Sequence, residues 1–124
     1  MELCRDRRLA DVKRPPRRGE VWWVALDPTL GSDIKKTRPA VVVSNDSCNR
    51  FGSRVVVVPV TSHVESLYPG EALVEIGGKR ARVLGDQIRS IDRLRLHSRL
   101  AVLSAGEMLV VDDALRVTLD LSAA

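Results

Sequence analysis

The chain has 124 residues, a length that suits one domain with one sizeable core. Its longest apolar run is about six residues, far short of the ~20 that a membrane helix requires, and residues 1–18 lack the apolar stretch of a secretory signal, so we expect a cytoplasmic protein. Residues 1–18 hold seven Lys/Arg and three Asp/Glu, which accounts for the whole formal charge of +4 and leaves the rest of the chain neutral overall.

Residues 1–18 have the composition of a basic leader. Alternating charges and the pair Pro15-Pro16 offer little apolar surface, so we expect this segment to be loosely ordered or to lie along the surface. The predicted domain spans residues 19–124. Cys4 and Cys48 lie in unlike surroundings without metal-ligand spacing, which predicts two free thiols.

Strand patterns dominate the body of the chain. They combine alternating or β-branched apolar residues with Gly, Pro and Asn/Asp at their ends. The predicted strands are residues 19–27, 40–44, 55–60, 72–76, 80–84, 91–96 and 99–103. Gly77-Gly78 can supply the positive φ angles of a tight hairpin turn between the fourth and fifth of these.

The pattern changes to that of a helix at Ser104. Ser104 and Glu107 have the spacing of a capping box. The residues that follow place apolar side chains on one helical face: Met108, Val111, Leu115, Thr118 and Leu119. The predicted fold is therefore mainly β with a C-terminal helix, a small barrel or half-open sheet closed by that helix.

Two apolar strands stop at polar groups that suit a phosphate. Arg38 precedes the strand at 40–44, and Thr61 follows the strand at 55–60, so the two can meet at one rim of the sheet as a cation beside a hydroxyl. Pro39 restricts the backbone of Arg38 to the extended region. Alternatively, Arg38 pairs with Asp33 or Glu71, and Thr61 bonds only to backbone.

For other polar residues near this rim, the sequence leaves more than one interpretation open. Lys35 and Lys36 are either contacts to backbone phosphates or a solvated loop tip. Ser62 either contacts a phosphate or makes a turn. Gln87 recognises a base edge, supports Arg38, or packs inside the barrel.

The segment 79–99 is strongly basic, with seven Lys/Arg and two Asp/Glu. Such a band can attract phosphates even in a domain that is neutral overall. Arginines of this kind also form salt bridges or a solvated face, and composition alone leaves both options open.

Several motifs occur in an order that is specific as a set. They are GEVWWVALDP at 19–28, GSD at 31–33, KTRPAVVVSND at 36–46, VPVTS at 58–62 and DQIRSIDRLRL at 86–96. Together they resemble the MazF/PemK family of toxin endoribonucleases from toxin–antitoxin pairs, from about Gly19 to the end of the chain.

This resemblance implies an SH3-like barrel of the MazF/CcdB type that forms a homodimer. It also implies growth-inhibiting, sequence-specific cleavage of single-stranded messenger, transfer or ribosomal RNA, without metal or other cofactor, by attack of the 2′-OH to give a 2′,3′-cyclic phosphate and a 5′-OH. The implied partner is an antitoxin with an acidic, disordered C-terminal segment. Catalytic roles carry over to Arg38 and Thr61, and substrate contact or loop control to Asp33.

Two other functions remain open at this stage. One is a topoisomerase-binding toxin of the CcdB type, which shares the barrel. That family ends in a Trp-containing tail, whereas this chain ends in Asp120-Leu-Ser-Ala-Ala. The other is a barrel that binds RNA without cutting it, for which the basic band would suffice.

Overall fold

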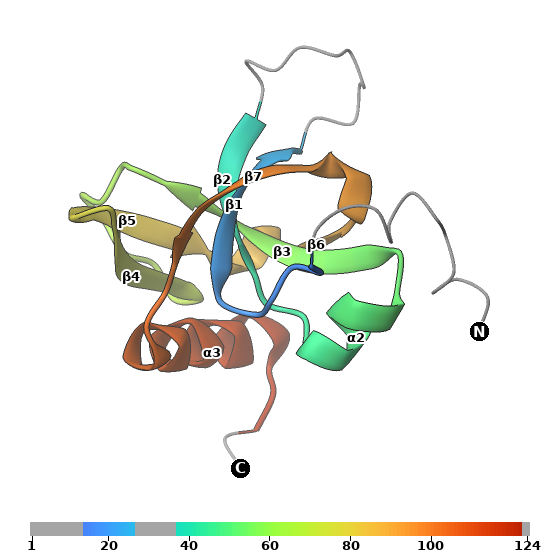
Figure 1. Cartoon of the computed structure of the whole chain (residues 1–124). Helices are drawn as coiled ribbons and strands as arrows, with labels where there is room; N and C mark the ends of the chain where they lie inside the picture. The colour runs from blue at the N-terminus through green and yellow to red at the C-terminus, as the bar shows by residue number, and fades with distance from the viewer. Residues whose placement is uncertain (1–13, 27–36, 123–124) are drawn as a thin grey trace.

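A strongly curved antiparallel sheet and a C-terminal helix make up the computed structural model, which describes residues 14–26 and 37–122 (Figure 1). The strands are β1 (Glu20–Ala25), β2 (Thr37–Val42), β3 (Arg54–Thr61), β4 (Glu71–Ile76), β5 (Lys79–Leu84), β6 (Arg89–Asp92) and β7 (Leu96–Val102). The helices are α2 (Asp46–Phe51) and α3 (Ala105–Leu119), and two 3-10 turns are η3 (Gly85–Gln87) and η4 (Arg93–Arg95).

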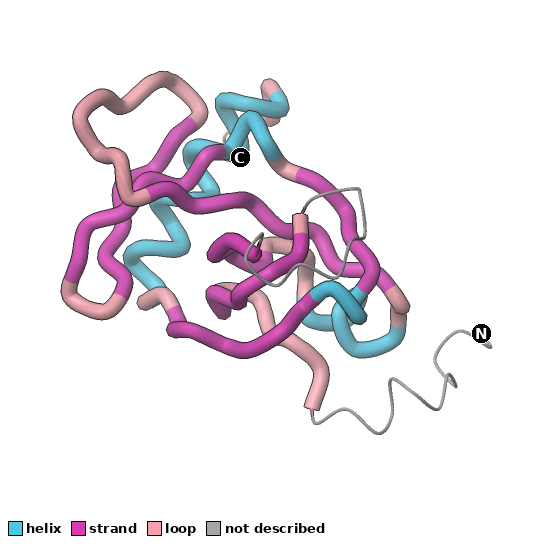
Figure 2. Tube along the Cα trace, turned by 90° about the horizontal axis from the view of Figure 1, so that it is seen from above, coloured by secondary structure: helices cyan, strands magenta, loops and turns pink. Residues whose placement is uncertain are grey.

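β3 is the strand that curls the sheet. The order of strands is β4-β5-β3-β2-β1-β7, and β6 pairs with β3 off this path. The first half of β3 pairs with β6, whereas Val60 and Thr61 pair with β5, so β3 passes from one neighbour to the other along its length. The result is the predicted half-open barrel, whose curvature is visible from above in Figure 2.

The alternation of side chains along the strands builds a core on each face of the sheet. The main core joins the sheet to α3 through Val41, Val58, Val83 and Val111, among others. A second core lies on the other face. Its buried residues are Val24, Leu26, Ala40, Val42, Val55, Val57 and Ile91, and Trp22 packs against them.

Two local predictions are confirmed. Gly77 and Gly78 both have positive φ angles, 61° and 82°, in the turn between β4 and β5. Ser104 and Glu107 form the capping box of α3 reciprocally through side chain and backbone. Of the predicted helical face, Met108, Val111 and Leu115 are buried.

Leu119 departs from that prediction, since 46% of it is exposed. It is the last residue of α3, and Asp120 follows in the left-handed conformation with a φ of 57°. Leu119 instead lines an open hollow beside the core, together with Val43, Ile88 and Leu115.

The strand predicted at 91–96 is interrupted: Ile91 and Asp92 belong to β6, Leu96 begins β7, and the η4 turn lies between them. β6 ends at Asp92, whose side chain accepts a hydrogen bond from the Leu94 N–H and starts the η4 turn. Arg93 is buried, and its guanidinium donates to the Gly52 carbonyl oxygen, while its backbone N–H donates to the Ser53 carbonyl oxygen. Because of these bonds, the chain leaves its pairing with β3 after Asp92 and turns before β7 begins.

The short helix α2 was not predicted, because Asn45, Asp46 and Gly52 indicated only turns. Asn45 is its N-cap and accepts a hydrogen bond from the Cys48 N–H. Asn49 is fully buried, and its amide donates to the Ser44 carbonyl oxygen at 3.0 Å. Cys48 is a free, exposed thiol, and Cys4 lies outside the described residues.

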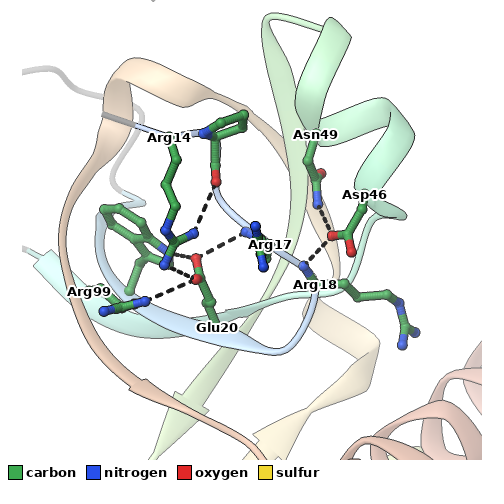
Figure 3. Close-up of polar contacts among 9 residues, drawn as sticks. Arg14, Arg17, Arg18, Glu20, Asp46, Asn49 and Arg99 are labelled. Atoms are coloured by element: carbon green, nitrogen blue, oxygen red, sulfur yellow. Dashed lines mark hydrogen bonds and ion pairs between the residues drawn. The ribbon is translucent and has the colours of Figure 1, made fainter. Parts of the chain in front are cut away.

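Residues 14–18 of the expected leader are attached to the sheet through Glu20, as Figure 3 shows. Glu20 is 3% exposed and accepts bonds from the Arg14 guanidinium at 2.8 Å and the Arg17 N–H at 3.0 Å. Arg18 reaches Asp112 on α3. The rest of the expected leader, residues 1–13, lies outside the described residues.

Candidate active site

Arg38 and Thr61 occupy matching positions on neighbouring strands. β2 and β3 pair at Ala40 with Pro59, and the same register continued by two residues sets Arg38 opposite Thr61. Opposite residues of an antiparallel pair share a face, with Cβ atoms about 5 Å apart. This is the face of the second core, which α3 does not cover, because α3 packs on the main core.

The guanidinium of Arg38 is available to a ligand. The residue is exposed, and within residues 14–26 and 37–122 it has no ion-pair partner. The alternative pairing with Glu71 is wrong, because Glu71 instead lies 3.5 Å from Nε of Arg82 and accepts from the Tyr68 N–H. Asp33, the other alternative partner, lies outside the described residues.

The hydroxyl of Thr61 can donate a hydrogen bond to a ligand. Its Oγ1 accepts a bond from the His63 N–H at 3.2 Å, which is the backbone contact that the structural alternative expects. A hydroxyl also has one donor, and the accepted bond leaves it unused. Thr61 is half-buried at the end of β3, so its position is fixed while its hydroxyl can still reach a ligand.

The remaining predicted site residues are placed as follows. Ser62 is exposed in the bend that follows β3. Gln87 is the last residue of η3 and is also exposed, so packing inside the barrel is wrong for it. Lys35 and Lys36 lie outside the described residues, as does Asp33.

The predicted basic band is not one continuous surface. Arg93 is buried, where desolvation lowers the pKa of its guanidinium. Arg99 pairs with Glu20 at 3.2 Å, and Arg82 pairs with Glu71. Lys79, Arg80 and Arg89 are exposed. Much of the band therefore holds the fold together.

Arg89 is an exposed member of the band that shares a face with the Arg38 and Thr61 pair. It lies opposite Val57 of β3, and Val57 belongs to the second core. A cation here extends the positive charge of the face from β2 and β3 to β6.

Glu20 organises the opposite end of this face (Figure 3). Besides the Arg14 and Arg17 bonds, its carboxylate accepts from the Trp22 indole N–H at 3.0 Å. Burial alone would raise the pKa of the Glu20 carboxyl, but the bonds from Arg17, Arg14 and Trp22 outweigh burial and leave the pKa below its ordinary value. The carboxylate is thus charged at neutral pH, and it fixes the Trp22 ring against the second core.

Nowhere in residues 14–26 and 37–122 do three or more His, Cys, Asp or Glu side chains gather as a metal would need. No helix in the same part of the chain has the length and apolar character to cross a membrane.

Known proteins with the same fold show the class to which this site belongs. Residues 17–119 match the model of the PemK-like, MazF-like toxins of type II toxin–antitoxin systems. The chain therefore belongs to this toxin family. It is 42% identical over 114 residues to endoribonuclease MazF9 of Mycobacterium tuberculosis, covering 85% of this chain and 97% of the relative. Its function is that of a MazF-like toxin endoribonuclease.

Solved structures agree. MazF from Deinococcus radiodurans matches with a TM-score of 0.70 and 30% identity, over 86% of this chain and 97% of that one. A mycobacterial endoribonuclease solved in complex with its cognate antitoxin matches with a TM-score of 0.73, over 88% and 99%; at 24% identity this match supports the fold. The predicted half-barrel is confirmed, and the topoisomerase-binding and non-cleaving alternatives lose their support.

Proposed function

We propose that this toxin cleaves single-stranded RNA without a metal ion, by attack of a 2′-OH on its own phosphate to give a 2′,3′-cyclic phosphate and a 5′-OH. The observation that carries the proposal is that Arg38 and Thr61 lie opposite each other on β2 and β3. Within residues 14–26 and 37–122 the Arg38 guanidinium has no ion-pair partner, and no hydrogen bond there uses the hydroxyl hydrogen of Thr61. A phosphate needs this combination of charge and directional donors.

Arg38 and Thr61 have different roles in this reaction. Negative charge grows on the non-bridging oxygens as the 2′-oxygen attacks, and the Arg38 guanidinium stays protonated and can take two of those oxygens at once. Thr61 donates its hydroxyl hydrogen to the same phosphate and holds it in line. Both groups lie at strand positions, so the site needs little reorganisation when RNA binds.

The other predicted site residues bind the rest of the substrate in this proposal. Lys35, Lys36 and Ser62 contact RNA backbone phosphates, which raises affinity without reading sequence. Gln87, exposed on η3, offers its amide to a base edge. Asp33 contacts substrate or controls the loop that precedes Arg38.

Cleavage in the presence of EDTA tests the proposal. We expect purified protein to cut single-stranded RNA at an undiminished rate in EDTA, and Arg38→Ala and Thr61→Ala each to lower the rate at least about 100-fold while remaining folded. Loss of cleavage in EDTA would contradict the metal-free reaction. Full activity in both variants would place the reaction elsewhere. Arg116→Ala on α3 is the control, since it removes an arginine that pairs with Asp113 on the far side of the sheet.

We further propose that the active form is a homodimer joined at the β7 edge. β7 ends the sheet, and it exposes Leu100 and Val102, while Leu109 and Val110 are exposed on α3 just after it. Trp23 of β1, the strand beside β7, is 37% exposed. Exposed apolar side chains along an edge strand are typical of a protein interface.

The proposed regulator is a cognate antitoxin whose acidic, disordered C-terminal segment occupies the RNA site. A mycobacterial protein of the same fold was solved with its cognate antitoxin, and an acidic peptide could pair with Arg38 and Arg89 where RNA phosphates would lie. In this proposal, RNA cleavage and antitoxin binding both take place in the cytoplasm. An acidic peptide that binds equally well after Arg38→Glu and Arg89→Glu would refute this mode.

A further inference from the structure

Arg82 of β5 lies in the same row of the sheet as Thr61. The two are direct partners in the ladder between β3 and β5, so their side chains share a face. The row of opposite residues thus runs from Arg38 through Thr61 to Arg82, with an arginine residue on each side of the threonine.

The guanidinium of Arg82 is held in place without being saturated. Its NH1 donates to the Ser66 carbonyl oxygen, and Glu71 lies across from Nε at 3.5 Å. That distance is an ion pair rather than a hydrogen bond, and in the part of the chain that the structure describes Nε is a buried donor with no acceptor. A buried, unpaired donor is costly unless a ligand uses it.

We propose that Arg82 is a second phosphate-binding group of the RNA site, acting across Thr61 from Arg38. Glu71 and Ser66 preset the guanidinium, and a phosphate of the same RNA strand accepts from its NH2 group, which neither of these contacts uses. This inference rests on the proposed RNA site. Its alternative is that Arg82 only ties the loop at 62–70 to β4 and β5.

Binding of RNA that cannot be cut separates the two readings. A short, randomised 2′-O-methyl RNA lacks the attacking hydroxyl, so affinity can be measured with the full chain at several salt concentrations. Each phosphate contact to a single strand contributes about 0.7 to the slope of log K against log salt. We expect Arg82→Ala to lower the slope by about 0.7 and to weaken binding roughly tenfold at fixed salt.

Glu71→Gln is the discriminating variant. If Arg82 binds phosphate, removing the competing carboxylate leaves RNA binding as tight or tighter, so the two variants move in opposite directions. If Arg82 only ties the loop, both variants weaken binding alike, with the wild-type salt slope. Glu71→Gln gives this answer even where Arg82→Ala fails to fold. Arg116→Ala, which removes an ion-paired arginine on α3, is expected to bind as the wild type does.

Failure of this inference is distinct from failure of the RNA site. Wild-type protein that does not bind the 2′-O-methyl RNA, or binding that Arg38→Ala leaves unchanged, would overturn the site as a whole. Binding that Arg38→Ala weakens but Arg82→Ala leaves unchanged in slope and affinity would overturn the role of Arg82 alone.

Discussion

Glu20 is the residue on which the described N-terminal segment depends. Its buried carboxylate joins Arg14, Arg99, the Arg17 N–H and the Trp22 indole. Glu20→Gln keeps the shape and removes the charge, so we expect the free energy of unfolding at pH 7 to fall by about 1–3 kcal/mol. Urea unfolding measures this loss. Asp113→Asn, at an exposed ion pair on α3, is the control and should change stability by less than about 0.5 kcal/mol.

The same residue predicts a pH dependence. The pKa of folded Glu20 is below its ordinary value of 4.5, so its charged form stabilises the fold above pH 4.5, and that contribution is lost as the pH falls through the folded pKa. The stability difference between wild type and Glu20→Gln should therefore shrink below pH 4.5. A difference that stays constant into this acid range would show that charge on Glu20 does not stabilise the fold.

Among single residues, the sequence predicted that Arg38 and Thr61 lie at one rim of the sheet, but it did not predict the roles of other arginines. Two apolar strands that end in polar groups suffice to place both residues at one rim. Arg82 was counted only as one charge of a basic segment, because its role follows from pairing between β3 and β5, which the sequence does not specify. The contacts of Arg93 with residues 52 and 53 depend on a long-range contact in the same way.

Among the elements, the loop at 62–70 packs closely against η3 and α3. A Cβ on Gly85 would lie 2.2 Å from the Gly70 carbonyl oxygen and 3.0 Å from Oγ1 of Thr118. Because backbone and helix must both shift, Gly85→Ala should lower the free energy of unfolding by about 2–3 kcal/mol.

Gly106→Ala on α3 is the matched control. The nearest atom to its added Cβ is Ser104 Oγ at 4.0 Å, and alanine is the better helix former, so stability should rise by about 0.5–1 kcal/mol. Thermal unfolding compares the two variants. Equal effects would show that the contact at Gly85 relaxes without cost.

Elements with complete local signals were predictable, and those that depend on distant contacts were not. The hairpin at Gly77-Gly78 and the capping box at Ser104 are each determined by residues that are neighbours in the sequence. The end of β6 depends on Asp92 capping η4 and on Arg93 meeting Gly52. α2 is only six residues long, and its buried Asn49 is satisfied by Ser44, so neither its length nor its pattern was a helical signal.

For the whole molecule, the edge of the sheet at β7 predicts the oligomeric state. Val102 is 60% exposed on this strand, and a charge there would have to be desolvated in an apolar interface. We expect wild-type protein to sediment as a dimer and Val102→Asp as a monomer. Phe51→Asp, at an exposed position on α2, should remain a dimer. A dimeric Val102→Asp would place the interface elsewhere.

Arg38 and Thr61 act on one phosphate in the proposed reaction, and a double-mutant cycle of the single-turnover cleavage rate in EDTA tests this most directly. Groups that stabilise the same transition state lose their effect together. We predict that the double variant Arg38→Ala/Thr61→Ala cleaves RNA only slightly more slowly than either single variant. Losses that multiply in full would mean that the two residues act independently, which would contradict a shared site.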